Sequence, residues 1–186
     1  MTYHLTTPLT QEDLAPLRAG DRVLLSGVLY TGRDAAHRRL AEALGRGEPL
    51  PVDLRGQAIY YVGPCPAPPG FPVGSCGPTT SGRVDAYTPL MLEQGLMAMI
   101  GKGFRTAEVV EAMARHGAVY FSATGGAGAL IARRVVACDV VAYGDLGTEA
   151  IHRMQVKDFP LVVAIDSRGV SLYEEGPKAY RRSEER

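Results

Sequence analysis

The segment RVLLSGVLYTGRDAAHRRLAEALG, residues 22–45, decides the fold class. Residues 22–30 are apolar and favour β structure, so we predict a strand with Gly27 as a bulge or a point of close approach. Residues 31–34 then begin a helix. The apolar residues of this helix recur at helical spacing and share one face, namely Ala36, Leu40 and Leu44.

The same alternation of strands and helices continues along the chain, which predicts an α/β fold in one domain, residues 1–186. Pro89 should shorten or kink one of the helices. Residues 1–20 are interpreted as an N-terminal extension and 177–186 as a charged tail, both at the domain edges. Further strands are expected at 57–62, 96–100, 118–122, 155–156 and 161–165, and helices at 10–20, 84–93, 106–117 and up to Ala132.

Composition and charge argue against several functional classes. Lys plus Arg and Asp plus Glu both number 20, so the net charge is zero, whereas nucleic-acid binders are usually basic. No apolar run approaches the ~20 residues that span a bilayer, and the first residues, MTYHL, lack a signal-peptide pattern. We therefore expect a cytoplasmic protein that binds neither nucleic acid nor membranes. Three cysteines, an odd number, do not suggest a disulfide framework.

A Gly/Pro-rich loop over residues 63–82 leads into GSCGPTTSGRVD, residues 74–85. Three consecutive hydroxyls, Thr79 to Ser81, precede an expected helix, where hydroxyls and free N–H groups can hold an anion. Arg83 adds a planar fork that suits a carboxylate. The pattern indicates a site for a small anionic substrate with a hydroxyl near the reacting atom, although a capped helix after an ordinary turn explains the spacing equally well.

Two other motifs carry cations at strand ends. Arg33 and Asp34 follow the strand at 22–30, and His37 lies one helical turn later. Lys102 lies between two glycines after another expected strand. Ligands of open α/β sheets bind beyond the carboxyl ends of strands, which points to a functional role for Arg33, although a surface ion pair with an acidic neighbour is a common alternative. The glycines beside Lys102 would let a ligand approach, but from this motif alone a solvated turn lysine is the preferred interpretation.

Two features suggest cofactors more weakly. The turn TGGAG, residues 124–128, invites a dinucleotide-binding interpretation, but Ile131 stands where the motif needs Gly or Ala. Tight packing of helix on strand is the preferred role. Three thiolates could hold an iron–sulfur cluster with one open iron, yet no zinc pattern is present and buried free thiols are the simpler interpretation for Cys65, Cys76 and Cys138.

Five ordered blocks resemble the β subunit of class I fumarate hydratases and L-tartrate dehydratases, which is also the C-terminal domain of the single-chain enzymes. The resemblance runs from about residue 24 to 173. It implies a swivelling β/β/α domain with a mixed sheet and flanking helices. The blocks are SGVLYTGRDAAHRRL, GSCGPTTSGRVDAYTPLML, MIGKG, YFSATGGAGAL and YGDLGTEAIHRMQVKDFPLVVAIDSRG.

The resemblance also implies the reaction and a partner. The reaction would be reversible hydration of fumarate to L-malate, or dehydration of L(+)-tartrate to oxaloacetate. An α subunit would hold a 4Fe–4S cluster on its own cysteines, so this chain would bind no metal. The active site would lie between the subunits of an α2β2 assembly. A non-catalytic anion-binding domain is the rival from another class.

Individual residues of this sequence match the family motifs. Arg33 and Arg83 match arginines that hold substrate carboxylates, and Thr79 matches the proposed catalytic base. Lys102 matches a lysine at the substrate, with roles in binding and catalysis, although the segment before it is one residue shorter than in the single-chain enzymes. Supporting roles are predicted for their neighbours Asp34, His37 and Thr80.

Overall fold

Strand β2 (Arg22–Thr31) is the strand around which the sheet is built. In the computed structural model, which describes residues 1–181, β2 runs parallel to β1 (Thr2–Thr6) and β3 (Ala58–Tyr60). On its other edge it pairs antiparallel with β7 (Ile151–Ile165). The sheet is therefore mixed.

The remaining strands complete this sheet, and the helices connect them. Within residues 1–181 the sheet has seven strands. The other elements are β4 (Ala98–Gly101), β5 (Val119–Ser122), β6 (Val135–Ala142), α1 (Gln11–Leu14), α2 (Asp34–Gly45), the 3-10 helix η1 (Ser81–Tyr87), α3 (Thr88–Glu93), α4 (Ala107–His116), α5 (Gly128–Ala132), the 3-10 helix η2 (Gly144–Glu149) and α6 (Leu172–Tyr180). The strand order is β1-β2-β3-β4-β5-β7-β6.

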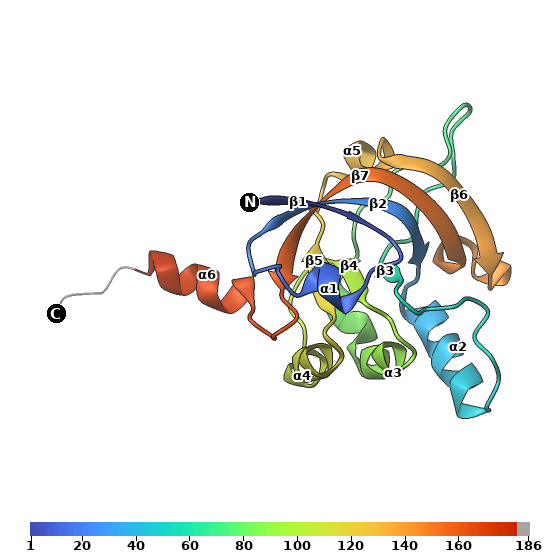
Figure 1. Cartoon of the computed structure of the whole chain (residues 1–186). Helices are drawn as coiled ribbons and strands as arrows, with labels where there is room; N and C mark the ends of the chain where they lie inside the picture. Colours follow the sequence, from blue (N-terminus) through green and yellow to red (C-terminus); the bar gives the residue numbers. More distant parts are fainter. Residues whose placement is uncertain (182–186) are drawn as a thin grey trace.

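The sheet folds over into two layers, because β7 pairs with both β2 and β5. Figure 1 shows β1, β2, β7 and β6 as a curved layer above β3, β4 and β5, with α2, α3 and α4 on the opposite side. The predicted α/β class, a single domain with a mixed sheet and flanking helices, is confirmed.

The middle strands are buried on both faces. Successive side chains of a strand point to opposite faces, so Tyr60 and Phe121 enter the core between the two strand layers. Their neighbours Ile59 and Tyr120 enter the second core, beneath the helices. This double burial explains why these strands are continuous apolar runs in the sequence.

Gly27 serves both of its predicted purposes. The pairing of β2 with β7 shifts register between Leu25 and Gly27, and Gly27 has φ 99°. A Cβ there would lie 2.5 Å from the hydroxyl oxygen of Thr7. Only glycine fits this backbone conformation and this contact.

Two helix boundaries follow from local chemistry. The side chain of Thr106 accepts a hydrogen bond from the Val109 amide and caps α4, which ends at the left-handed Gly117. Thr10 forms a capping box with Asp13, but α1 stops at Leu14, short of the predicted end at residue 20. The predicted helix at 84–93 is divided into η1 and α3, with Pro89 in the first turn of α3.

Three further segments have secondary structure that was not predicted from the sequence. Residues 2–6 of the expected N-terminal extension form β1, paired with β2. The two expected late strands are one 15-residue strand, because a bulge at Lys157 and Asp158 lets β7 continue past the polar residues. Residues 177–180 of the expected tail belong to α6, which projects from the body in Figure 1; residues 182–186 lie outside the described residues.

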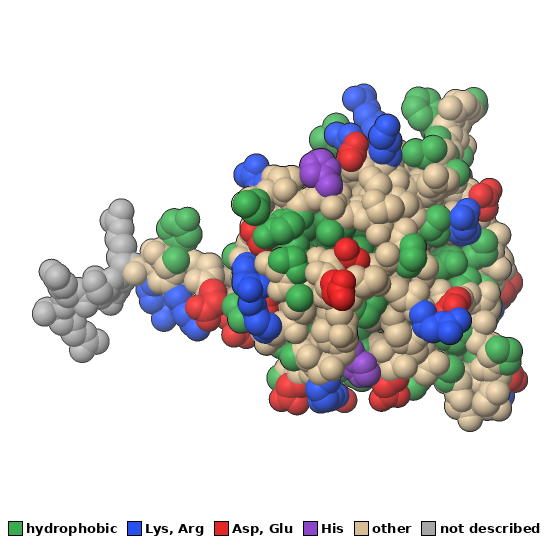
Figure 2. Space-filling view, viewed as in Figure 1, with side chains coloured by type: hydrophobic (Ala, Val, Ile, Leu, Met, Phe, Trp, Pro, Cys, Tyr) green, Lys and Arg blue, Asp and Glu red, His purple; other side chains and the backbone are tan. Residues whose placement is uncertain are grey.

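The Gly/Pro-rich loop is ordered and projects from the sheet. It leaves after β3 and closes on itself, because the Cys65 amide donates to Ser75 O (2.9 Å) and the Gly74 amide donates to Cys65 O (3.0 Å). The loop rises beyond β6 in Figure 1, and apolar side chains lie over it in Figure 2. Phe71 at its tip is 64% exposed.

Candidate active site

The carboxyl ends of β2, β3, β4 and β5 lie along one edge, since these strands run parallel. Arg33 follows β2, Lys102 follows β4, and the turn at 124–128 follows β5. Thr79 reaches the same edge by bonding to Tyr61, the residue after β3. Arg33 and Lys102 thus lie at strand ends as predicted, and Thr79, which was predicted before a helix, lies at the same edge through its bond to Tyr61.

Residues 79–81 continue the sheet where β3 stops. The Thr79 amide donates to Tyr61 O (2.8 Å), and the Lys102 amide donates to Thr79 O (3.3 Å). The Ser81 amide in turn donates to Lys102 O (2.9 Å), and Thr80 forms a parallel bridge with Lys102. The hydroxyl-bearing segment and the lysine turn are therefore directly hydrogen-bonded.

The hydroxyl of Thr79 is oriented by the backbone. Its Oγ1 donates to the carbonyl oxygen of Tyr61 (2.8 Å), and the side chain is half-buried. The oxygen lone pairs stay free to accept a hydrogen bond. Thr80 is exposed and its side chain makes no capping bond to η1, so the alternative of a hydroxyl-capped helix is wrong for Thr80.

Lys102 is exposed, and its side chain extends toward the turn after β5. A Cβ added to Gly125 would lie 3.8 Å from Lys102 Nζ and 3.6 Å from its Cδ. These are ordinary van der Waals distances, so the lysine side chain lies directly against this turn. This contact joins the TGGAG turn to the candidate site without any nucleotide.

Gly128, at the start of α5, supports the packing interpretation of the same turn. A Cβ at this position would lie 2.4 Å from Ser75 Oγ and 2.8 Å from the Gly77 amide nitrogen. The Cys76 amide also donates to Gly128 O (3.2 Å). The turn therefore carries the base of the loop that contains Thr79.

Gly128→Ala should destabilise the protein by about 2 kcal/mol, because the added methyl collides with backbone that cannot move freely. Urea unfolding at neutral pH measures the loss. Gly126→Ala is a neighbouring comparison with open space around the new methyl, although its φ of 79° adds backbone strain. An unfolding midpoint for Gly128→Ala equal to that of the unmodified chain would contradict the packing role.

Arg33 precedes α2 and is held by an acid that the sequence analysis did not single out. Its Nη2 lies 3.2 Å from Glu149 Oε1 and 3.9 Å from Asp34 Oδ1, and the side chain is 24% exposed. The predicted ion pair with an acidic neighbour thus exists, yet Arg33 Nε is buried and has no partner among residues 1–181. Glu149 is 116 positions away in η2, so no local spacing could reveal it.

His37 lies behind Arg33 and is fully buried. Its Nδ1 is 2.8 Å from Arg33 O, and because a carbonyl only accepts, Nδ1 must donate. The centroid of its ring lies 5.5 Å from that of Tyr61 in an edge-on contact, and Nε2 has no hydrogen-bond partner in the described part of the chain. Burial lowers the pKa of His37 to about 4, and nearby Arg105 adds to this effect. His37 is thus a neutral support for Arg33, away from solvent.

Arg83 lies on η1, two residues beyond Ser81, and is exposed. Within residues 1–181 its guanidinium takes part in no side-chain hydrogen bond or ion pair. The structure does not bring it into contact with the other predicted residues. It is a cation available for an incoming anion.

The three cysteines, candidate ligands of an iron–sulfur cluster, differ in their exposure to solvent. Cys65 is exposed, Cys76 buried and Cys138 half-buried. Among residues 1–181 no group of three or more His, Cys, Asp or Glu side chains could hold a metal ion. Burial raises the pKa of Cys76 to about 12 and that of Cys138 to about 11, so both remain thiols at neutral pH.

No helix within the described part of the chain has the length and apolar character to cross a membrane.

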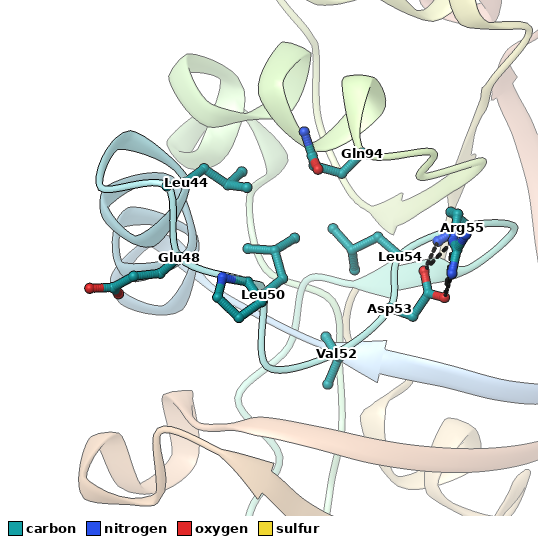
Figure 3. Close-up of a pocket in the computed structure, with 10 residues that line it drawn as sticks. Leu44, Glu48, Leu50, Val52, Asp53, Leu54, Arg55 and Gln94 are labelled. Carbon is teal, nitrogen blue, oxygen red and sulfur yellow. Dashed lines mark hydrogen bonds and ion pairs between the residues drawn. The ribbon is translucent and has the colours of Figure 1, made fainter.

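A pocket at the opposite end of α2 lies apart from the candidate site. Figure 3 shows Leu44, Leu50 and Leu54 around it, with the Asp53–Arg55 ion pair at one side. A 12-residue helix is about 18 Å long, and Arg33 precedes its other end. None of the predicted site residues lines this pocket.

Comparison with known proteins gives consistent matches. The chain matches the family described as "Fumarase C-terminus" over residues 2–176. It is 39% identical over 156 residues to "Fumarate hydratase class I, anaerobic" of Escherichia coli (strain K12). This alignment covers 83% of this chain and 28% of that protein. It is 37% identical over 167 residues to "Fumarate hydratase 2" of Leishmania major, covering 88% and 29%.

A fourth match has a similar length. The chain is 39% identical over 184 residues to "Putative L(+)-tartrate dehydratase subunit beta" of Methanocaldococcus jannaschii, covering 95% of this chain and 94% of that protein. The chain thus spans less than a third of the two fumarate hydratases above and nearly all of this subunit. The match over residues 2–176 and these identities agree with the resemblance found in the sequence blocks, and the chain belongs to the Fumarase C-terminus family.

Proposed function

We propose that this chain is the β subunit of a heteromeric iron–sulfur hydro-lyase that reversibly hydrates fumarate to L-malate. The observation that carries the proposal is the hydrogen-bonded pairing of the Thr79 segment with Lys102 at the strand ends that also carry Arg33. The names of the relatives, fumarate hydratases and a tartrate dehydratase subunit beta, support a hydro-lyase. The two strand layers and one helix layer support assignment to the swivelling β/β/α domains.

Substrate binding in this proposal uses separated cations. A flat dicarboxylate needs two anchors, and Arg33 and Arg83 lie on different elements, at α2 and η1. Each guanidinium can hold a carboxylate by two parallel hydrogen bonds. Glu149 occupies one side of Arg33 and fixes its direction, which leaves the remaining N–H groups for substrate.

Proton transfer in this proposal uses Thr79. Removing a proton beside a carboxylate builds negative charge on that carboxylate, and Lys102 with the arginines would stabilise this charge more than the ground state. The Thr79 hydroxyl would take the substrate proton as its own proton, donated to Tyr61 O in this structure, passes to a second acceptor. Because an ordinary hydroxyl is a weak base, we assign that acceptor to the partner subunit.

The 4Fe–4S cluster is assigned to the α subunit. The described residues of this chain include no group of three or more His, Cys, Asp or Glu side chains that could hold a metal ion, and in the α subunit the cluster would supply a Lewis acid for the departing hydroxyl. We further propose an α2β2 assembly in the cytoplasm, with the active site between the subunits.

A second candidate is dehydration of L(+)-tartrate to oxaloacetate. It is favoured by one observation, because the relative of matching length is named as a tartrate dehydratase subunit beta. Both substrates carry two carboxylates, so Arg33 and Arg83 suit either. Residues outside this chain would then read the second hydroxyl.

Anaerobic co-expression with the α subunit, followed by cluster reconstitution, tests the proposal. Fumarate absorbance reports L-malate dehydration, and oxaloacetate formation reports L-tartrate dehydration. Activity only when both chains are present supports the β-subunit role, and the faster substrate identifies the enzyme. A stable complex with an intact cluster but no turnover of either diacid would reject both substrates.

A further inference from the structure

A buried ion pair joins the two motifs that carry Thr79 and Lys102. Arg105 Nε lies 2.6 Å from Asp85 Oδ1, and the two side chains are 0% and 6% exposed. Asp85 lies two residues after Arg83, and Arg105 three residues after Lys102. The other carboxylate oxygen of Asp85 accepts from the Thr106 amide (2.8 Å). The pair thus fastens η1 to the segment between β4 and α4.

Aromatic side chains extend this contact to the candidate site. The Arg105 guanidinium carbon lies 5.5 Å from the centroid of the Tyr61 ring and 5.0 Å from that of Tyr120. Tyr61 supplies the carbonyl that holds Thr79. The Tyr120 hydroxyl lies 2.8 Å from Ser81 Oγ and donates to Gly103 O (3.0 Å).

The side chains around this cluster are tightly packed. Arg105 Nη2 donates to Thr88 Oγ1 (2.7 Å), so the guanidinium is fixed from three sides. A Cβ on Gly101 would lie 2.1 Å from Ser81 Oγ and 2.8 Å from the ring of Tyr61. The cluster therefore determines how the 79–83 segment lies against the 101–103 turn.

Stability alone does not account for a buried ion pair. Removing two charges from water costs about as much as their attraction returns, and well-packed neutral residues often serve as well. Neutral residues do not fix the orientation of their neighbours in the same way. The planar guanidinium of arginine makes several hydrogen bonds and two ring contacts at once, each in a defined direction. A site that must hold two carboxylates and a hydroxyl in one geometry needs such direction.

We infer that Asp85 and Arg105 are positioning residues, which hold Thr79, Arg83 and Lys102 in register for a dicarboxylate without touching it. This inference rests on the proposed function for its substrate. Its structural part, control of the 79–83 segment relative to the 101–103 turn, is independent of any reaction.

The test compares two matched double variants of the full chain. Asp85→Asn with Arg105→Met removes both buried charges together, so neither is left unpaired. Asp166→Asn with Arg168→Met removes a second ion pair beyond β7, 2.8 Å apart, in which the aspartate is 1% exposed and the arginine 45% exposed. Arg105→Lys, which keeps the charge and loses the fork, is used if the first variant does not fold.

Amide hydrogen exchange tests the structural part of the inference, the position of the 79–83 segment relative to the 101–103 turn, and needs no enzyme activity. We expect the amides of Ser81 and Lys102, which bond across the two motifs, to exchange at least tenfold faster in the Asp85/Arg105 variant. The Val163 amide, which donates to Asp21 O (2.9 Å) elsewhere in the sheet, should be unchanged. Equal exchange at Ser81 and Lys102 in both double variants would overturn the inference, even if no diacid is a substrate.

Steady-state kinetics of the complex with the α subunit test the substrate part of the inference, the positioning of these residues for a dicarboxylate. A positioning role predicts at least a tenfold higher KM for the diacid in the Asp85/Arg105 variant, with the control variant unchanged. A merely structural role predicts less active enzyme with an unaltered KM, and that outcome would overturn the inference. If the unmodified complex turns over no diacid, the proposed function fails, and the exchange result decides the positioning role alone.

Discussion

Thr79→Val should lower kcat of the assembled enzyme about a thousandfold while changing KM little, because general acid–base groups contribute about 10²–10⁴. Valine matches threonine in shape, so the half-buried site stays filled. The Tyr61 carbonyl keeps a donor, since the residue 79 amide also bonds to it (2.8 Å). The variant therefore removes only the hydroxyl. Steady-state kinetics of the complex with fumarate, L-malate and L-tartrate measure the effect.

Two comparison variants define the result for Thr79. Thr79→Ser restores a hydroxyl and should keep part of the turnover. Thr6→Val changes an exposed threonine at the end of β1, which pairs with Ser26 of β2 and with none of the candidate site residues, and should leave kinetics unchanged. Near-normal kcat in Thr79→Val would remove Thr79 from the proton-transfer step and leave it as a backbone spacer.

Stability should depend on pH through His37. Its pKa falls from its usual 6.5 to about 4 in the folded chain, first because it is buried and also because Arg105 is near, despite the opposing effects of Arg33 O and Asp34. Between these pH values the unfolded chain binds a proton that the folded chain does not. The contribution of His37 to the free energy of unfolding is therefore fully present above pH 6.5. It is lost as the pH falls from 6.5 to 4, and the total loss is about 3 kcal/mol.

His37→Asn isolates this contribution, because the asparagine amide can still donate to Arg33 O and does not titrate. Between pH 7 and 5 the unmodified chain should lose about 2 kcal/mol more stability than the variant. Urea titrations at closely spaced pH values measure the difference, and the carboxylates common to both proteins cancel. Parallel pH profiles for the two proteins would show that His37 is protonated as readily in the folded chain as in the unfolded one.

Much of the sheet could be predicted from the sequence because its middle strands are buried on both faces. The runs around Ile59, Met99 and Tyr120 are continuously apolar, and that signal is local. Strand β1 has no such signal, since residues 2–6 alternate and are mostly exposed. Its place depends on pairing with β2, which no local pattern encodes.

The candidate site could be predicted in part for the same reason. Arg33, Thr79 and Lys102 each follow a strand or lie in a Gly-rich motif, so local sequence identified them as candidates, and the family resemblance supplied their expected roles. Glu149 and Arg105 were missed because their partners are distant in sequence and their surroundings look ordinary. Contacts of this kind depend on the folded backbone.

The position of β7 bears on how the chain folds during synthesis. Residues 151–165 pair with β2, β5 and β6, and the backbone groups of β2 that they satisfy are made more than a hundred residues earlier. Until the ribosome releases them, β2 and β5 each present an open edge that other chains can join. Such long-range pairing is also slow, because loop closure costs entropy before contacts form. Truncations that stop before residue 151 should therefore aggregate, and timely chaperone binding should matter most over the last third of translation.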